Sequence, residues 1–221
     1  MLTAIERNSL AIEVAKRIQT EIISGRIKPG EKLLEQELSN MMKTSRGPVR
    51  DALIILEHEG LVVREYNRGA TVVRMTASDV EEVSSLRLCL EQFALKYAIE
   101  KASQEDIERL EELIKSLRMS LKKKLTDTEA VDLDLQFHEE FVKSSKHSRL
   151  LIMWQSIKTQ IRFLILTRNA FNIHEFEKAA DNHEDLLDAI RNKDIEKGMK
   201  VLQAHDDRSY ARLIASVRGS P

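Results

Sequence analysis

The chain has 221 residues, of which 42% are hydrophobic and 32% charged, and its formal net charge is −1 at pH 7. This is the composition of a globular protein rather than a disordered one, and the single cysteine, Cys89, excludes an intrachain disulfide framework. No apolar run approaches the ~20 residues that span a bilayer and residues 1–10 lack a signal-peptide core, so we expect a cytoplasmic protein without a membrane partner.

Residues that interrupt helices are concentrated near the N-terminus. Five of the seven glycines and two of the three prolines precede residue 70, and residues 70–197 contain neither type. Glycine and proline are the residues that most often end helices and form turns. The sequence therefore predicts a turn-rich domain over residues 1–75 and an uninterrupted helical domain over residues 76–221.

The first domain has the element order of a winged helix-turn-helix. Helical spacing of apolar residues predicts a helix over 10–23, and a turn at 28–30 precedes a short helix from Leu33 to Met42. A third helix is expected over 45–59, with Pro48 tolerated in its first turn. Residues 61–64 and 70–73 are β-prone and joined by turn residues, which predicts a hairpin.

In such a fold the start of the third helix reaches base edges in the major groove. Arg46 and Arg50 are four residues apart, so they project from one helix face, and each arginine fork can bind guanine in a bidentate manner. Arg68 and Gly69 lie at the hairpin tip, where the glycine permits close backbone approach and the arginine can enter a minor groove. Alternatively the arginines are ordinary solvated charges paired with neighbouring carboxylates; the surrounding helices and hairpin favour DNA binding.

The same region carries a family resemblance. The segments 29–33, 37–39, 45–53 and 56–62, with the core pattern SR-x-PVR-x-AL, resemble the head of GntR-type bacterial transcription regulators. The resemblance implies a homodimer that binds a palindromic double-stranded DNA operator. By motif position it implies DNA contacts from Gln36, Ser45, Arg46, Arg50, Arg68 and Gly69. Gln36 stands where many relatives have arginine, and Lys43-Thr44 replaces a common Gly-Val pair, which affects the operator sequence rather than the mode of binding.

The second domain is predicted to be an antiparallel bundle of helices without strands. Ser78-x-x-Glu81 and Thr126-x-x-Glu129 have the capping-box pattern that begins a helix, and Ser103 is a further N-cap candidate. The expected helices span about 78–102, 103–123, 126–145, 148–170, 175–191 and 194–216. The fold class is therefore mainly α.

Four residues of the second domain form a possible metal-ligand set. Asp134 and His138 are four apart and share one helix face, while His183 and His205 lie on two later helices. One carboxylate and three imidazoles suit Zn²⁺, Ni²⁺, Mn²⁺ or Fe²⁺. By spacing alone, histidines at helical positions are more often ordinary core or surface residues.

The sequence around these residues resembles the ligand-bearing segments of the FCD effector domain, which follows this head in the FadR subfamily of GntR regulators. The resembling segments are 134–138, 183–190 and 199–205. The resemblance implies that Asp134, His138, His183 and His205 hold a divalent metal whose open sites accept a small carboxylate effector. Three neutral imidazoles and one carboxylate leave such a site positive, which favours an anion. Arg87 and Arg162 are candidates to bind that effector, although both could equally lie on helix surfaces.

Three functions are compatible with these patterns. The first is a ligand-responsive DNA-binding regulator, such as a repressor of a metabolic operon; the second is a regulator whose metal is purely structural. The third is a metal-dependent enzyme, because His138-Glu139-Glu140 begins like an HExxH motif, but Val142 replaces its second histidine. No phosphate-binding loop or nucleophile motif is present, so we do not expect an enzyme.

Overall fold

The computed structural model describes residues 7–65, 69–122, 126–167 and 173–218. The chain divides into two compact units, Met1–Arg74 and Met75–Pro221. Within the described ranges, no helix combines the length and apolar character needed to cross a membrane.

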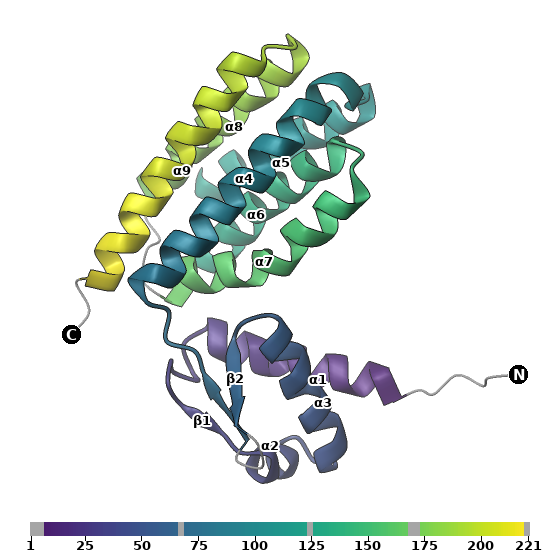
Figure 1. Cartoon of the computed structure of the whole chain (residues 1–221), viewed down its shortest axis with the longest axis vertical. Coiled ribbons are helices and arrows are strands. Elements are labelled where there is room, and N and C mark those ends of the chain that lie inside the picture. The colour runs from purple at the N-terminus through teal and green to yellow at the C-terminus, as the bar shows by residue number, and fades with distance from the viewer. Residues whose placement is uncertain (1–6, 66–68, 123–125, 168–172, 219–221) are drawn as a thin grey trace, which may run out of the picture. The chain divides into compact units, whose positions relative to one another are not determined.

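The described residues of the first unit form three helices and a small sheet (Figure 1). The helices are α1 (Arg7–Ile23), α2 (Glu35–Met41) and α3 (Arg46–His58), and the strands are β1 (Lys32–Leu33), β2 (Val62–Glu65) and β3 (Gly69–Val72). Helix α1 packs against α3, and the fully buried side chains of Ile18 and Ile22 from α1, with Leu53 and Leu56 from α3, belong to the core of this unit. The predicted helix order and hairpin are confirmed.

The sheet has one strand more than the sequence predicts. Strand β3 lies between β2 and β1, and both pairings are antiparallel. Leu33, which was expected to open the second helix, instead pairs with Ala70 and is buried. That expectation was wrong because a two-residue strand has no periodicity of its own, and the burial of Leu33 comes from tertiary pairing. Helix α2 begins two residues later, after the extended residue Leu34.

Helices are the only regular secondary structure among the described residues of the second unit. Its helices lie side by side in Figure 1 and are α4 (Ala77–Lys101), α5 (Gln104–Lys122), α6 (Asp127–Ser144), α7 (Ser148–Thr167), α8 (Ile173–Arg191) and α9 (Ile195–Arg218). Thr126 and Glu129 form the predicted capping box of α6. The expected box at Ser78 was wrong: Thr76 caps α4, and its partner is the Asp79 carboxylate. An aspartate can complete this box as well as the glutamate that the pattern assumed.

Helix α9 approaches α4 closely because of a glycine. A Cβ at Gly198 of α9 would lie 2.7 Å from Cδ2 of Leu95 on α4, closer than real Cβ contacts. Leu95 is fully buried, and α4 also contacts α6, α7 and α8. Helix α4 is therefore central to the unit, and the polar residues on its inner face lie next to those of the helices that carry the predicted metal ligands.

Candidate metal centre and nucleic-acid interface

The predicted DNA-contacting arginines of α3 are held by side chains of α2. The Arg46 guanidinium donates a hydrogen bond to Oε1 of Gln36. Arg50 donates two hydrogen bonds to Glu35, from Nε over 3.2 Å and from Nη2 over 3.1 Å. The Arg50 side chain nevertheless remains 58% exposed. Because exposed ion pairs and hydrogen bonds contribute little net stability, both arginines can exchange their partners on α2 for a ligand at low cost.

The remaining predicted DNA contacts lie at the ends of elements. Ser45 is the exposed N-cap residue of α3. Gly69 begins β3 with φ +85°, and a Cβ there would collide with the carbonyl oxygen of Leu33. Glycine at this position is therefore required by the pairing of β1 with β3, in addition to any role toward DNA. Arg68 lies outside the described residues.

The four predicted metal ligands converge in the interior of the helical unit. One ligand atom from each of Asp134 and His138 on α6, His183 on α8 and His205 on α9 lies within 4.8 Å of the others. Nε2 of His183 is 3.2 Å from Nε2 of His138 and 3.3 Å from Oδ1 of Asp134. Donor atoms bound to one ion at about 2.0–2.2 Å would lie similarly close together, so the group needs only a small adjustment to surround a cation.

The orientation of two rings is fixed by neighbours. The His183 ring stacks on Phe137, with centroids 3.9 Å apart and planes 16° from parallel. Nδ1 of His138 lies 3.0 Å from Oε1 of Glu91 on α4, a short contact although it is not aligned as a hydrogen bond. A carboxylate beside one ring nitrogen favours the proton on that nitrogen, which leaves Nε2 free to ligate a metal. Nε2 of His138 thus faces the centre.

Protonation of the group also suits a cation. Burial lowers the pKa of both His183 and His205 well below the usual histidine value, and the neighbouring His138 lowers it further. Both rings are therefore neutral at neutral pH, which is the ligating form. Oδ1 of Asp134 is buried and accepts no hydrogen bond from the described residues. A buried polar atom without a partner destabilises the fold, and a cation bound here would provide that partner. The residues present therefore fit a divalent metal ion.

Three further polar residues surround the centre, and sequence reasoning identified only Arg87 among them. Arg87 donates from Nε to Oε1 of Glu91 over 2.9 Å, and Trp154 of α7 donates from Nε1 to the same oxygen over 3.1 Å. Burial alone would raise the pKa of Glu91, but Arg87 and His138 outweigh it, so the pKa lies well below its ordinary range. The (i, i+4) spacing of Arg87 and Glu91 was the available sequence signal; nothing indicated that the pair faces inward.

A narrow cavity adjoins the centre. Its volume is about 10 Å³, which is room for about one water molecule. It is lined by Arg87, Asp134, Ile165, Ala179, His205, Ser209 and Arg212. Nη2 of Arg87 is buried and has no hydrogen-bond partner among the described residues. The second effector candidate, Arg162, is not among the lining residues; its guanidinium donates to both carboxylate oxygens of Asp132, over 2.5 and 3.0 Å.

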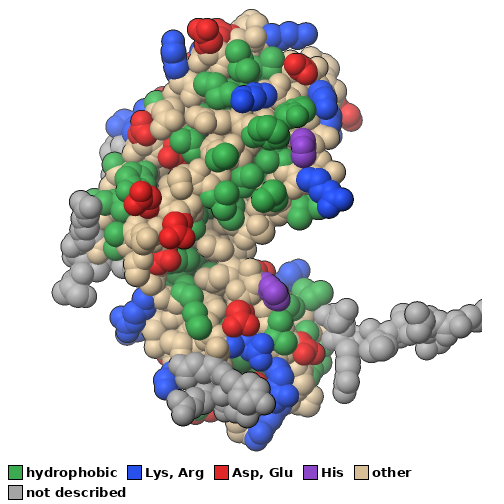
Figure 2. Space-filling model, viewed as in Figure 1, with side chains coloured by type: hydrophobic (Ala, Val, Ile, Leu, Met, Phe, Trp, Pro, Cys, Tyr) green, Lys and Arg blue, Asp and Glu red, His purple; other side chains and the backbone are tan. Residues whose placement is uncertain are grey.

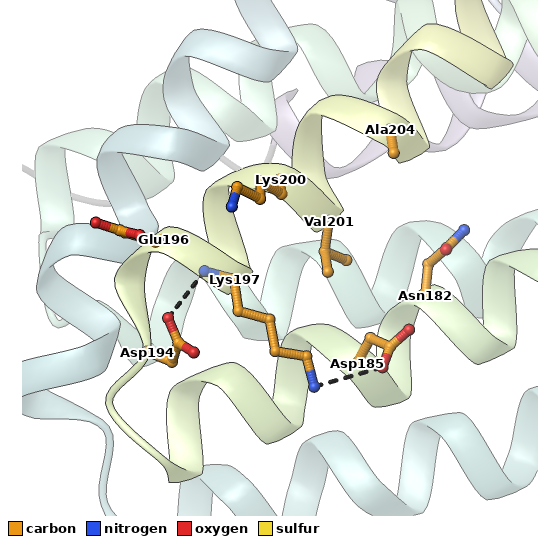
Figure 3. A pocket seen from close by; sticks show the side chains of 8 residues that line it. All are labelled: Asn182, Asp185, Asp194, Glu196, Lys197, Lys200, Val201 and Ala204. Carbon is orange, nitrogen blue, oxygen red and sulfur yellow. Dashed lines mark hydrogen bonds and ion pairs between the residues drawn. The ribbon is translucent and has the colours of Figure 1, made fainter.

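A larger hollow on the outside of the bundle has a different character (Figure 3). It holds about 520 Å³ and is lined by Asn182, Asp185, Asp194, Glu196, Lys197, Lys200, Val201 and Ala204. Lys197 pairs there with Asp185 at 3.5 Å, while its backbone N–H donates to the Asp194 carboxylate at the start of α9. These contacts explain Lys197, Asp185 and Asp194 as surface pairing and helix capping, and none of the predicted site residues lines this hollow.

Comparisons with known proteins agree with both units. The family described as bacterial regulatory proteins, gntR family, matches residues 10–72, and the FCD domain matches residues 82–208. The gluconate operon transcriptional repressor of Bacillus licheniformis is 31% identical, over 92% of this chain and 84% of the relative; that of Bacillus subtilis is 28% identical, over 86% and 79%. The structure of E. coli McbR/YncC has a similar fold, with a TM-score of 0.76 at 24% identity, over 96% of this chain and 98% of that one. The chain therefore belongs to the GntR family of bacterial transcriptional regulators and carries an FCD domain.

Proposed function

We propose that this regulator is a ligand-responsive repressor that binds a palindromic operator as a homodimer in the cytoplasm. Residues 1–75 would bind DNA, and residues 76–221 would hold a divalent metal, bind a small carboxylate and form the dimer. The observation that carries the effector role is the buried group of Asp134, His138, His183 and His205. The family and the relatives of this chain are DNA-binding regulators rather than enzymes. The buried group would therefore serve ligand sensing and not turnover.

Sequence-specific DNA binding would depend on the start of α3. The proposed contacts are Gln36, Ser45, Arg46, Arg50, Arg68 and Gly69. Arg46 and Arg50 are exposed and donate their side-chain hydrogen bonds, among the described residues, to side chains of α2, which supports their availability to base edges. Loss of one bidentate base contact lowers affinity about 5- to 150-fold and relaxes specificity at one position in each half-site.

The DNA-binding proposal is tested with Arg46→Ala and Arg50→Ala on operator and scrambled duplexes. Arg26→Ala is a matched control, because Arg26 is an exposed arginine of the same unit that pairs with Glu21 of α1 and is not among the proposed DNA contacts. We expect large losses on the operator only. Equal and small losses on both duplexes would show that the arginines do not read bases.

At the metal centre, the three histidines and Asp134 would be the protein ligands of Zn²⁺, Ni²⁺, Mn²⁺ or Fe²⁺. When bound, the ion would supply a positive, Lewis-acidic point to which a carboxylate oxygen can bind. Arg87 lines the adjoining cavity, and its Nη2 is buried without a hydrogen-bond partner among the described residues. We assign this nitrogen to the other carboxylate oxygen of the effector. Elemental analysis of the wild type against the quadruple alanine variant, with His147→Ala as control, should show about one metal per chain lost only in the quadruple variant.

The small volume of the adjoining cavity, about 10 Å³, favours a second candidate: a structural metal with water as its remaining ligand. The effector-binding metal and the structural metal are distinguished by titrating small carboxylates into metal-loaded protein and measuring operator affinity. Gluconate belongs among the probes because relatives are named for a gluconate operon. A ligand that binds one dimer arrangement better typically changes operator affinity about 5- to 150-fold. No change with any bound carboxylate would leave the structural metal as the better description.

A further inference from the structure

The turn between α2 and α3 contains a lysine in a backbone conformation that L-amino acids rarely adopt. Lys43 has φ +52°, in the left-handed region, where a Cβ lies too close to the following carbonyl oxygen and glycine is favoured. Two further lysines, Lys146 and Lys193, have φ +55° and +56°. All three follow the end of a helix, at the position where glycine is the usual residue. The three positions therefore make the same demand on the backbone, and they differ in the surroundings of the side chain.

Two backbone hydrogen bonds close the turn at Lys43. The N–H of Lys43 donates to the carbonyl of Asn40 over 3.2 Å. The N–H of Thr44 donates to the carbonyl of Ser39 over 3.0 Å. The turn after α8 is closed in the same way around Lys193, with bonds of 3.2 and 2.8 Å. Paired bonds of this kind form the Schellman end of a helix, so the turn fixes the direction in which the Lys43 side chain leaves the backbone.

The three lysine side chains have different surroundings. The Lys146 ammonium pairs with the buried Asp106 carboxylate at 2.5 Å, so this lysine has a structural partner within the second unit. Lys193 is exposed and lies in a segment, residues 188–196, that contains three carboxylates and two cations. Lys43 is also exposed, and no ion pair within the described residues engages its ammonium group. The Lys43 charge is therefore available to a partner outside the chain.

The charged residues that surround Lys43 in the sequence are all basic. Residues 38–50 contain Lys43, Arg46 and Arg50 but no carboxylate. Figure 2 shows Lys and Arg side chains at the end of the first unit where α2 lies in Figure 1. Lys43 precedes Arg46 by three residues, so their Cα atoms are at most about 11 Å apart. The Lys43 charge therefore adds to the positive potential of the surface that the two arginines present.

We propose that Lys43 is a further DNA contact of this regulator, and that it binds a backbone phosphate beside the bases that Arg46 and Arg50 would reach. A lysine is a compact point charge that suits a phosphate oxygen, and it lacks the planar fork with which arginine binds guanine. Its contribution to affinity would therefore be independent of base sequence. The inference rests on the proposed DNA-binding surface and extends that surface to the α2–α3 turn.

The left-handed backbone allows a test in which DNA affinity falls without a loss of stability. Lys43→Gly removes the charge and places at φ +52° the residue that adopts this conformation without strain, so we expect a Tm equal to or above that of the wild type. Affinity for the operator and for a scrambled duplex should fall by the same factor, at least about fivefold at 0.1 M salt. Losing one phosphate contact in each chain of a dimer should also make the slope of log affinity against log salt shallower by about 1.8. Fluorescence anisotropy between about 50 and 200 mM salt measures both.

Three variants separate charge from backbone effects. Lys193→Gly makes the same backbone change in the second unit, and we expect an equal or higher Tm with unchanged DNA affinity. Lys43→Gln retains a Cβ and a long polar side chain and should lose affinity as Lys43→Gly does, whereas Lys43→Arg should retain it. A Lys43→Gln variant with the affinity and salt slope of the wild type would overturn the inference even if Lys43→Gly binds weakly, because flexibility of the turn would then be responsible.

The proposed DNA-binding surface is tested separately by Arg46→Ala. If Arg46→Ala lowers operator affinity and Lys43→Gln does not, the arginine binds the operator and the turn makes no contact. If neither variant changes affinity, the DNA-binding surface lies elsewhere and both proposals are rejected. A loss from Lys43→Gln on the operator alone would contradict the phosphate contact, because it would mean that Lys43 reads a base.

Discussion

The two units use polar residues in opposite ways. In the first unit the arginines that we propose to bind DNA are exposed, and their partners on α2 are also near the surface: Arg50 is 58% and Glu35 21% exposed. In the second unit the pair of Arg87 and Glu91 is 5% and 3% exposed and lies beside the candidate metal ligands. An exposed pair can exchange partners freely, which suits DNA binding. A buried pair has no water to replace a lost partner, which suits a preorganised ligand site.

The largest expected effect comes from breaking the buried pair. Glu91→Ala leaves the Arg87 guanidinium buried without its carboxylate and removes the acceptor of Trp154. We expect it to lower the free energy of unfolding by about 3–5 kcal/mol, the usual result of leaving one buried charge unpaired. Asp132→Ala, which breaks the more exposed pair with Arg162, should cost less than about 1 kcal/mol. Urea denaturation of metal-free protein measures both, and similar losses would contradict the contrast between buried and exposed pairs.

Metal binding should stabilise the second unit selectively. An ion bound only by the folded state at a free concentration a hundredfold above its Kd adds about 2.7 kcal/mol to the free energy of unfolding. We expect Zn²⁺ or Ni²⁺ to raise the Tm of the wild type. Thermal denaturation with and without chelator measures this increase. His183→Ala should abolish the metal-dependent increase, whatever its effect on the metal-free protein, while His147→Ala retains it. An equal increase in both variants would exclude His183 as a ligand.

Sequence patterns predicted the helices well, but they predicted poorly which residues of different helices contact one another. The absence of glycine and proline over 70–197 was enough to indicate a helical bundle, and the four-residue spacing placed Asp134 and His138 on one face. That His183 and His205 face the same point depends on how three helices pack, and only the family resemblance anticipated it. Glu91 was missed and Arg162 was considered for the same reason: spacing reveals which residues share a helix face, but not what that face meets.

A smaller loss of stability is expected from a substitution at the start of α5. A buried carboxylate there, Asp106, both caps the helix and pairs with cationic side chains. Asp106 accepts hydrogen bonds from the backbone and hydroxyl of Ser103, each over 2.8 Å, and contacts Lys146 at 2.5 Å. Burial alone would raise the pKa of Asp106, but Lys146 and Ser103 together hold it well below its usual value. The charged form is therefore favoured by folding.

Asp106→Asn should accordingly lower stability by about 1–2 kcal/mol at pH 7. Because the folded-state pKa is depressed, the contribution of Asp106 is fully present above the unfolded-state pKa of about 3.9 and is lost as pH falls toward the folded-state value. The difference between wild type and variant should thus shrink below about pH 4, as measured by urea denaturation across pH. Glu105→Gln, at an exposed position of the same helical turn, serves as control. A difference independent of pH would mean that the charge of Asp106 is unimportant.

The smallest expected effect is a change in operator affinity, and it concerns the exposed ion pair of Arg50 and Glu35 in the first unit. If Arg50 contacts operator DNA, it must first give up both hydrogen bonds to Glu35, so Glu35 competes with the DNA. Glu35→Gln should therefore raise operator affinity a few-fold, measured by fluorescence anisotropy at fixed salt. Removing any negative charge near phosphates also helps binding, and Glu37→Gln on the same helix, at an exposed position, measures that general contribution. We expect a larger gain from Glu35→Gln than from Glu37→Gln, and no such excess when Arg50 is already alanine. Equal gains would show that the ion pair with Arg50 does not restrain DNA binding.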